Sequence, residues 1–392
     1  MNFRIPFKIT FWKVVLILAW MLGIVAGIIR FTRGLGYATN MSDHFPWGLW
    51  IGFDILCGVG LAAGGFTIAA IVYIFHIKRF YPILRPTILT AFLGYIMVIV
   101  GLLFDLGQPL RIWHLIFWWN PHSVLFEVGW CVMLYTTVLA LEFSPVLFER
   151  LGWTGPKRWI KKVTIPLVIA GVILSTLHQS SLGSLYLIMP GKLYPFWYSP
   201  ILPFLFFISA VAVGCAMVIF ESHLSGRAFG HRLRLDILTD LGRVMLVTLG
   251  VYLILKIQDF SAHGVWPYLL KMRTETYLFL SEILVGVIVP IILLSIKKIR
   301  LTTRGVYYAS VCAIAGFLLN RINVTVTGMQ ASSGVSYFPS WMEISITLAI
   351  VATGFFVFSL AIRYLPIFEH PQEAIPTVQQ DTDLEGALFE TG

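Results

Sequence analysis

Long apolar segments recur along the whole chain, and short polar loops separate them. Each segment is long enough to cross the hydrocarbon core of a bilayer as an α-helix. The first has no small-residue cleavage site, so we interpret it as a spanning helix and not as a signal peptide. The pattern predicts an all-α integral membrane protein with ten spans, near residues 11–29, 47–75, 87–104, 122–143, 164–187, 200–221, 237–258, 276–296, 306–322 and 342–363.

Charge placement along the loops predicts the orientation. Of the 28 Lys and Arg residues, 19 lie at the N-terminus or on the same side as it, and 6 lie in the opposite loops. Cytoplasmic loops are enriched in Lys and Arg, so we expect a bacterial inner-membrane protein with both termini in the cytoplasm. Residues 1–365 are expected to form one polytopic transmembrane domain. The polar, acidic segment 366–392 is expected to be a disordered cytoplasmic tail.

Composition supports a membrane protein and excludes several other classes. Charged residues make up 12% of the chain and hydrophobic residues 58%, whereas soluble domains carry about 25% charged residues. The net charge of +9 comes largely from loop residues and does not indicate nucleic-acid binding. The four cysteines are isolated in apolar segments without a C-x-x-C pair, so the sequence encodes neither an iron–sulfur cluster nor a zinc site.

One apolar segment, Pro46 to Gly65, combines six glycines with a single acid, Asp54. A carboxylate within hydrocarbon is costly and is a functional hypothesis by default. Small residues at this density allow close helix packing and leave room for a flat ligand. Since Pro46 lies on the predicted outer side, Asp54 should lie about two turns inward. We expect this helix to form one wall of a site that opens outward.

Further polar residues fall inside the spans and are mostly in the outer half. Tyr95 lies near the middle of the third span, and Glu221 lies toward the cytoplasmic half of the sixth. Such series are typical of proton relays and substrate paths. Glu127 has no cation near it in sequence, and a buried acid without a partner is expected to be neutral at rest, which suits a proton carrier. The outer-half residues are Asp54, Asp105, Glu127, His178, Gln179, Glu282, Asn320, Arg321 and Glu343.

Structural roles are the alternative for several of these groups. Asp240 and Arg243 are three residues apart on one helix face, where they are expected to neutralise each other. Arg321 is either part of the polar pocket or a structural partner of Glu343 or Glu282.

The histidines argue against haem. Nine are present, but only His178 lies clearly within a span, and bis-histidine haem needs two that face each other. We therefore predict no haem and no metal, and a subunit that binds a small redox molecule. His178 is either a core histidine bonded to a carbonyl or a functional group. Aromatic residues crowd the outer loops 112–121 and 191–200, either as an interfacial belt or as a docking surface for an extracytoplasmic partner.

Six blocks of sequence carry a family resemblance, namely PWGLWIGFDILCGVGLAAGGFTIA (46–69), FDLGQPLRIWHL (104–115), NPHSVLFEVGWCVMLYT (120–136), LALEFSPVLFERLGW (139–153), TLHQSSLGSL (176–185) and YFPSWMEISI (337–346). The first three resemble the NrfD-type membrane subunits of the polysulfide reductase family, which are quinone-binding anchors of respiratory complexes. The last three are most similar to the membrane subunits of periplasm-facing nickel–iron hydrogenases.

This resemblance implies two four-helix bundles, over spans two to five and six to nine, with an outer helix at each end. It also implies a site for menaquinone or another quinone near the outer face. Some relatives carry a histidine on the glycine-rich helix, where this chain has none, and Asp54 is expected to take its place. The implied residues are Trp47, Gly48, Asp54 and His178 for the quinone, and Glu127, His178, Tyr95 and Glu221 for proton transfer.

The implied partners are a periplasmic ferredoxin-like iron–sulfur subunit with a membrane helix and the small and large subunits of a nickel–iron hydrogenase. The chain would host quinone reduction without activating hydrogen itself. Protons drawn from the cytoplasm through Glu221, Tyr95 and Glu127 would build membrane potential, and the inward series of polar groups favours this over uptake from outside. The alternatives are a quinol-oxidising anchor of a molybdenum-type reductase, a secondary transporter, and a purely structural anchor.

Overall fold

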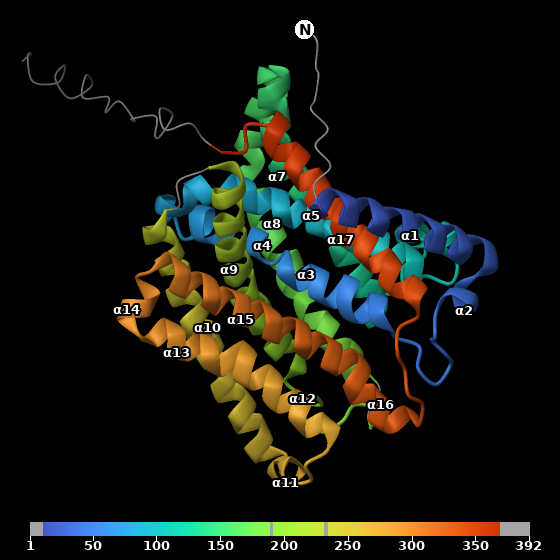
Figure 1. Ribbon diagram of the computed structural model, residues 1–392. Helices are drawn as coiled ribbons and strands as arrows, with labels where there is room; N and C mark the ends of the chain where they lie inside the picture. The colour runs from blue at the N-terminus through green and yellow to red at the C-terminus, as the bar shows by residue number, and fades with distance from the viewer. Residues whose placement is uncertain (1–10, 189–190, 231–233, 369–392) are drawn as a thin grey trace, which may run out of the picture.

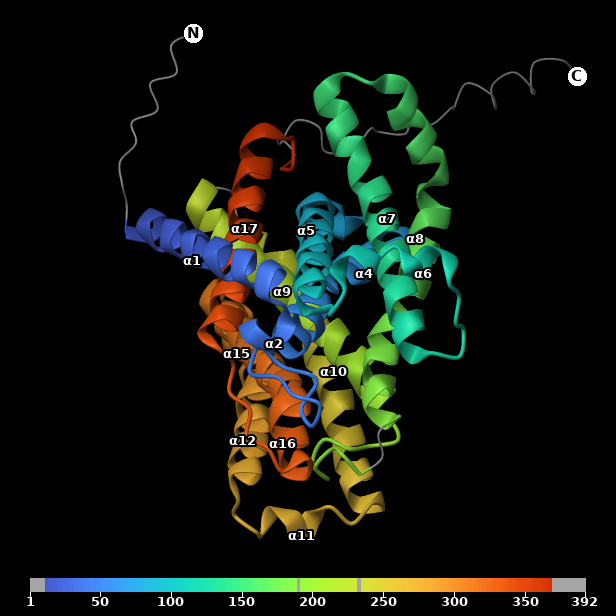
Figure 2. The same cartoon turned by 90° about the vertical axis from the view of Figure 1, so that its right-hand side faces the viewer.

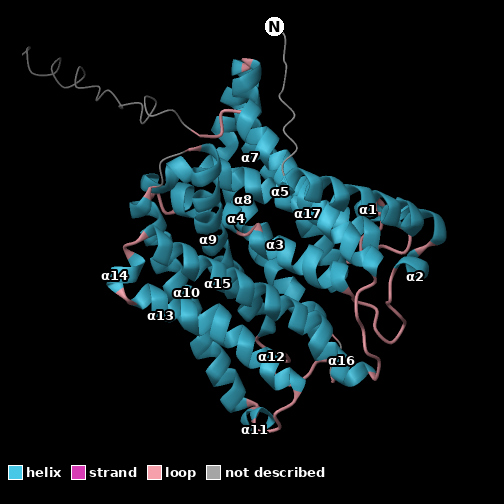
Figure 3. Ribbon diagram, viewed as in Figure 1, coloured by secondary structure: helices cyan, strands magenta, loops and turns pink. Residues whose placement is uncertain are grey.

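The computed structural model describes residues 11–188, 191–230 and 234–368, and these residues form helices joined by loops (Figure 1, Figure 3). Within these described residues, ten helices are long and apolar enough to cross a membrane, which confirms the all-α fold with ten spans. The described residues contain no strand beyond an isolated bridge between Ser42 and Phe45. The outer side below is the side that charge placement predicts to face away from the cytoplasm.

The spans are numbered one to ten in chain order. Short helices in the loops are α2 (Leu35–Ala38), η3 (Lys78–Phe80), η4 (Pro109–Arg111), α6 (His114–Phe117), α11 (Trp266–Leu269) and α14 (Lys297–Arg300). The spans are α1 (Phe11–Arg33); η1 (Trp50–Cys57) with α3 (Gly58–Leu61), α4 (Gly64–Ala69) and η2 (Ala70–Ile74); α5 (Tyr81–Asp105); α7 (Val124–Leu151); α8 (Thr154–Leu187); α9 (Leu202–Phe229); α10 (Leu235–Ala262); α12 (Thr274–Ile283) with η5 (Leu284–Ile288) and α13 (Val289–Ser295); α15 (Thr303–Ile322) with η6 (Asn323–Thr327) and α16 (Gly328–Ser333); and α17 (Trp341–Tyr364).

The spans form the two bundles that the resemblance implied. In bundle one, spans two to five pack in chain order and α8 closes the ring against α4 and η2. In bundle two, spans six to nine do the same, and α15 closes the ring against α9. The outer helices α1 and α17 pack against each other, as both views show (Figure 1, Figure 2). The indole of Trp20 donates a hydrogen bond to Thr353 Oγ1 across this contact at 3.1 Å.

Glycines bring the two bundles into backbone contact. A Cβ on Gly214 of α9 would lie 2.7 Å from the nitrogen of Gly64 and 2.8 Å from the carbonyl carbon of Ala63. A real Cβ does not approach backbone that closely, so only glycine allows spans two and six to cross here. The glycine richness of the second span therefore serves the joining of the bundles as well as ligand space.

Three spans contain wide, π-helical turns in their outer or central parts. Spans two, eight and nine have them at Trp50–Cys57, Leu284–Ile288 and Asn323–Thr327. Such turns shift the register of a helix, leave backbone groups less regularly paired, and occur often at functional sites. Asp54 lies within the first of them, and the other two lie close to the buried groups of bundle two.

Spans four and five extend beyond the predicted limits of 122–143 and 164–187. Helices α7 and α8 pack along their lengths and project from the rest of the molecule as a hairpin (Figure 2). Gly152, at φ 72°, ends α7 in the left-handed conformation that glycine adopts most easily. The length of an apolar segment predicts only the part of a helix that lies within the hydrocarbon, whereas the packing of α7 against α8 continues beyond that part.

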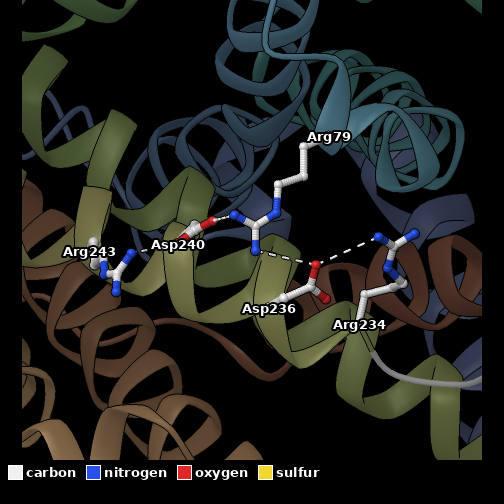
Figure 4. Close-up of polar contacts among 5 residues, drawn as sticks. All are labelled: Arg79, Arg234, Asp236, Asp240 and Arg243. Atoms are coloured by element: carbon white, nitrogen blue, oxygen red, sulfur yellow. Dashed lines mark hydrogen bonds and ion pairs between the residues drawn. The ribbon is translucent and has the colours of Figure 1, made fainter.

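An ion-pair network joins the bundles on the inner side (Figure 4). Asp240 pairs with Arg243 at 2.8 Å, which confirms the predicted neutralisation. Arg79 of η3 adds pairs with Asp240 at 2.6 Å and Asp236 at 3.3 Å, and Asp236 also lies 3.6 Å from Arg234. Because the groups are largely exposed, each pair should contribute only about 0.2–1 kcal/mol, so the network orients the bundles more than it stabilises them.

The chain remains packed just beyond the last span. Ile367 is 1% exposed and lies in a core cluster with Leu89 and Val146. The remainder of the predicted tail, residues 369–392, lies outside the described residues.

Candidate functional site

An apolar groove runs between spans two, three, six and ten and holds about 1530 Å³ of empty space. Its walls include Phe53, Met97, Met217 and Phe355, and the lining is mostly aliphatic and aromatic. The lining contains two carboxylates, Asp54 and Glu221, of which Asp54 lies nearer the outer side. The groove therefore offers a long apolar surface with acids at separate depths.

Asp54 is held in place at the outer end of the groove. Its side chain is 5% exposed, and its Oδ2 accepts a hydrogen bond from Thr347 of α17 at 2.6 Å. Gly101 of α5 makes room for it, because a Cβ there would lie 2.8 Å from the Cβ of Asp54. The carboxyl group is thus desolvated, fixed by one hydroxyl, and at the groove wall.

Glu221 lies farther in. Its Oε2 accepts a hydrogen bond from Thr90 Oγ1 at 2.6 Å, which links α9 of bundle two with α5 of bundle one. Both residues line the groove. The two acids of the groove therefore have the same arrangement, a carboxyl group with one threonine donor.

A second polar cluster lies inside bundle one and contains Tyr95 and His178, both fully buried. The Tyr95 hydroxyl is hydrogen-bonded to His178 Nε2. His178 Nδ1 lies 2.7 Å from the carbonyl oxygen of Leu174. A carbonyl can only accept, so in the neutral ring Nδ1 carries the hydrogen and Nε2 accepts from Tyr95. His178 has the carbonyl partner of a core histidine and, in addition, a phenol partner on another span.

Sequence reasoning missed two members of this cluster, Tyr135 of α7 and Ser175 of α8. The rings of Tyr135 and Tyr95 have centroids 4.8 Å apart. Tyr135 Oη and Ser175 Oγ are buried without a hydrogen-bond partner among the described residues, and such orphaned groups are uncommon and call for an explanation, such as an unobserved water. Their signal in the sequence was spacing, since Tyr135 lies eight residues after Glu127 and Ser175 lies three before His178.

Glu127 has a partner, contrary to expectation. Its side chain is only half-buried, and the hydroxyl of Ser181 donates to its Oε1 at 2.7 Å. Ser181 follows His178 by three residues and so lies on nearly the same face of α8. The search for a cation near Glu127 could not reveal a serine on the neighbouring helix. Glu127 and His178 therefore belong to one series of groups along spans four and five.

Trp47 and Gly48 lie just before the second span at its outer end. The rings of Trp47 and Tyr186 meet edge to face at 5.3 Å. A Cβ on Gly48 would lie 3.0 Å from Glu343 Oε1. These residues therefore pack against the α8 end and the start of α17, outside the groove.

Glu343 is structural. It forms a capping box with Ser340 at the start of α17, and it accepts a hydrogen bond from the Tyr337 hydroxyl at 2.5 Å. Burial raises the pKa of Tyr337 above its ordinary value, and the bond to Glu343 acts in the same direction. Among the described residues Arg321 forms no direct ion pair with Glu343 or Glu282. It bonds Asn320 at 2.7 Å and Ser209 at 2.8 Å, and Asn320 in turn donates to Glu282 at 3.0 Å.

The third span separates the two candidate sites. Gly94 and Val98 of α5 line the groove, whereas Tyr95, about 100° further around the helix, faces the interior of bundle one. The expected single pocket of Asp54, Trp47 and His178 is thus divided, with Asp54 in the groove and His178 in the bundle. Among the described residues, no group of three or more His, Cys, Asp or Glu side chains is placed to hold a metal ion.

Comparison with known proteins shows which family the sequence matches. The family model described as polysulphide reductase, NrfD, matches residues 37–332. A protein of Nitratidesulfovibrio vulgaris is 41% identical over 362 residues, which cover 90% of this chain and 93% of that protein. It is more similar than the expected hydrogenase-type relative, the probable Ni/Fe-hydrogenase 2 b-type cytochrome subunit of Escherichia coli K12, at 32% identity over 346 residues, 86% of this chain and 87% of that subunit.

A further relative is the integral membrane subunit of menaquinone reductase from N. vulgaris. It is 32% identical over 397 residues, which cover 94% of this chain and 93% of that subunit. The family model matches residues 37–332, and the relatives match over nearly the full length of the chain. The chain therefore belongs to the polysulphide reductase NrfD family of membrane proteins.

Proposed function

We propose that the chain is the quinone-binding membrane subunit of a respiratory oxidoreductase complex and passes electrons from an outer iron–sulfur subunit to menaquinone. The observation that carries this proposal is the groove, an apolar slot between spans two, three, six and ten that has a fixed carboxyl group, Asp54, near its outer end. An isoprenoid chain needs a long apolar surface, and a quinone headgroup needs a proton donor near its oxygens. The groove supplies both.

The relatives support this choice of substrate and partner. One relative bears the name menaquinone reductase and another the name Ni/Fe-hydrogenase 2, each at 32% identity. We therefore assign a ferredoxin-like iron–sulfur subunit and nickel–iron hydrogenase subunits as partners. The exposed aromatic residues Phe117, Trp118 and Trp119 at and just after α6 suit a docking surface for such a subunit on the outer side.

Reduction of a quinone to a quinol consumes two electrons and two protons. In the groove, the carboxyl group of Asp54 would donate a proton to a quinone oxygen, and Thr347 would hold that group in position. Glu221, at the inner part of the same groove, would resupply protons from the cytoplasmic side. The walls exclude water, which strengthens the electrostatic interaction between acid and headgroup.

Bundle one provides a second series of proton-carrying groups. From the outer side inward it contains Glu127, His178, Tyr95 and Tyr135, with hydrogen bonds at Glu127–Ser181 and Tyr95–His178. Glu142 follows Tyr135 by seven residues on α7 and so lies on the same face two turns further in. From Glu127 to Glu142 these groups follow about four turns of α7, which supports proton transfer across the membrane during quinone reduction.

The quinone site is tested by filling the groove. Met217→Trp enlarges a side chain in the groove wall, and we expect it to weaken binding of a menaquinone analogue to the purified chain in nanodiscs at least about tenfold, since overpacked sites lose on the order of 1–3 kcal/mol. Val247→Trp is the matched control, because Val247 is 64% exposed on α10 away from the groove. Equal affinity for both variants and the wild type would exclude the groove as the quinone site.

The proton series is tested at Glu127. Glu127→Gln keeps the shape of the side chain and an acceptor for Ser181 but cannot carry a proton, so we expect the membrane potential generated per quinone reduced to fall by about half or more in proteoliposomes containing the complex. Potential is read with a voltage-sensitive dye and quinone reduction by absorbance. Asp43→Asn, an exposed acid in an outer loop, is the control. Normal potential in Glu127→Gln would remove this residue from the path.

A further inference from the structure

The outer half of bundle two encloses ionisable side chains that the proposed function does not use. Glu282 of α12, Lys256 of α10 and Arg321 of α15 are 2%, 4% and 2% exposed. Acids and bases are almost never buried this far unless they are paired. Their contacts therefore show what the burial accomplishes.

Glu282 is held only by neutral donors. Trp197 Nε1 lies 3.1 Å from its Oε2, Asn323 Nδ2 donates to the same oxygen at 2.7 Å, and Asn320 Nδ2 donates to Oε1 at 3.0 Å. Among the described residues, no Lys or Arg side chain forms an ion pair with it. Such a shell can accommodate the carboxyl group. The Asn320 amide is fixed because its oxygen accepts from Arg321, whereas the oxygen of Asn323 meets a hydroxyl, that of Thr327, which can also accept, so the Asn323 amide can turn its oxygen toward a bound proton.

The two buried bases also lack a direct carboxylate partner within the described contacts. Lys256 Nζ donates to the carbonyl oxygen of Phe196 at 2.8 Å. The guanidinium of Arg321 lies 3.6 Å over the ring of Phe206 and bonds Asn320 and Ser209. Arg321 stays charged at any physiological pH. It is a fixed positive charge, whereas Lys256 and Glu282 are groups that can exchange protons.

Two small chambers lie beside these groups. One is lined by Lys256, Arg321, Asn320 and Tyr252, and apolar side chains complete its wall. The other is lined by Glu282, Asn320 and Tyr252 and otherwise mainly by apolar residues. Asn320 and Tyr252 border both chambers. Each has room for about one or two water molecules, and a water beside Asn320 and Tyr252 would bridge Lys256 and Glu282.

A line of titratable groups leads from Lys256 to the outer surface. Asp259 lies three residues beyond it on the same face of α10 and has a side chain that is 2% exposed. The hydroxyl of Ser199 donates to Asp259 at 2.8 Å, and His263 Nδ1 lies 3.1 Å from the same carboxyl oxygen. The side chain of His263 is 48% exposed. From the surface inward, the order of these groups is thus His263, Asp259, Lys256 and Glu282.

The line has no continuation toward the inner side through the second chamber. The inner walls of that chamber are Leu249, Val287 and Ala313 with glycines, and its only titratable lining residues are Glu282 and Tyr252. A proton that reaches Glu282 from outside therefore returns by the same route.

Bundle two repeats the plan of bundle one. In each bundle the second helix carries a tyrosine, the third a glutamate, and the fourth a leucine followed by two polar residues. The corresponding residues are Tyr95 and Tyr252; Glu127 and Glu282; and Leu177-His178-Gln179 and Leu319-Asn320-Arg321. The polar cluster of bundle two therefore draws on the same three helices of its bundle, the second, third and fourth, as the groups of bundle one.

We propose that Glu282 is a proton-binding site that exchanges with the outer aqueous phase through Lys256, Asp259 and His263. A proton enters on the His263 ring, passes to the Asp259 carboxylate, and moves by Lys256 and chamber water to the Glu282 carboxylate; release reverses each step. Arg321 and Tyr252 face Glu282 from α15 and α10, and Trp197 faces it from the loop before α9. This role goes beyond quinone binding and does not depend on it.

The test uses the full-length chain in nanodiscs and follows carboxyl protonation by infrared spectroscopy after a rapid drop in pH. We expect a protonated-carboxyl band that Glu282→Gln removes, and whose rate of appearance falls at least tenfold in Asp259→Asn and in His263→Ala. His44→Ala changes an exposed histidine in an outer loop and should leave band and rate unchanged. Size-exclusion profile and circular dichroism establish that each variant is folded.

Two results would overturn the proposal. An unchanged spectrum in folded Glu282→Gln would show that this acid does not titrate, and an unchanged rate in both Asp259→Asn and His263→Ala would show that protons arrive by another route. If Glu282→Gln does not fold, Glu282→Asp keeps a carboxyl group and should retain the band at a shifted frequency; a band at the unchanged frequency has the same overturning force, because another group would then produce it. Binding of the menaquinone analogue, measured separately with Met217→Trp, distinguishes failure of this proposal from failure of the quinone site.

Discussion

Replacing Asp54 with asparagine is expected to lower the rate of menaquinone-analogue reduction by the complex about a hundredfold or more. A positioned general acid contributes roughly 10²–10⁴ to a rate, and Asp54 is the carboxyl group that α17 holds at the outer part of the groove. Asparagine has nearly the same shape and can keep the bond to Thr347, so the fold and the affinity for quinone should persist. Stopped-flow absorbance of the complex purified with its partner subunits measures the rate.

Two further variants separate proton donation from position. Thr347→Val leaves the carboxyl group in place without its hydroxyl partner, and a smaller loss of up to about tenfold is expected, since a hydrogen bond between neutral groups is worth roughly 0.5–1.5 kcal/mol. Asp43→Asn, in the outer loop, should have no effect. If the Asp54→Asn variant reduces the quinone at the wild-type rate, the proton comes from another group. The series of groups in bundle one would then be the alternative donor.

The largest effect on folding is expected for Gly214→Val. The added Cβ would lie 2.7–2.8 Å from the backbone of Ala63 and Gly64, so the two bundles would have to separate where they cross. Overpacking of this kind costs about 3 kcal/mol or more, because backbone cannot move aside as a side chain can. We expect little monodisperse protein on size-exclusion chromatography in detergent and a clearly lower midpoint of thermal unfolding for whatever remains.

Gly250→Val is the matched control for this variant. Gly250 also lies within a spanning helix, α10, but a Cβ there meets nothing within 4 Å. Both changes carry the same difference in helix propensity, so a difference between them reports the contact alone. If the Gly214→Val variant elutes and melts like Gly250→Val, the backbones of spans two and six do not cross in direct contact at Gly214.

Much of the fold follows from local patterns. A run of about 20 apolar residues is enough to predict a span, and all ten were predicted. Several helices continue beyond the predicted limits, as at the inner ends of α7, α8 and α9 and at the outer end of the ninth span. The pair Asp240–Arg243 was predictable for the same reason, because residues three apart on a helix are neighbours whatever surrounds them. The pairing of Arg79 with Asp240 was not predictable, since Arg79 comes from the other bundle.

The candidate site was predictable in kind but not in arrangement. Sequence alone selected Asp54, Glu127, His178, Tyr95 and Glu221 as polar groups in hydrocarbon, and family resemblance suggested a quinone. It could not show that Tyr95 and His178 bond each other, or that Ser181 is the partner of Glu127. Those contacts join residues 54 to 83 positions apart, and no local rule relates them.

What the sequence by itself determined is which segments lie in the membrane and which of their residues are too polar to be there without a reason. Tertiary structure decided which of those residues share a space. Asp54 faces the groove and His178 faces the bundle because α5 turns Gly94 and Tyr95 to different sides, and a Cβ on Gly94 would lie 3.0 Å from the Cβ of Ala62. The rotation of a helix about its axis is set by such contacts with distant segments, whereas its length and polarity are set by its own residues.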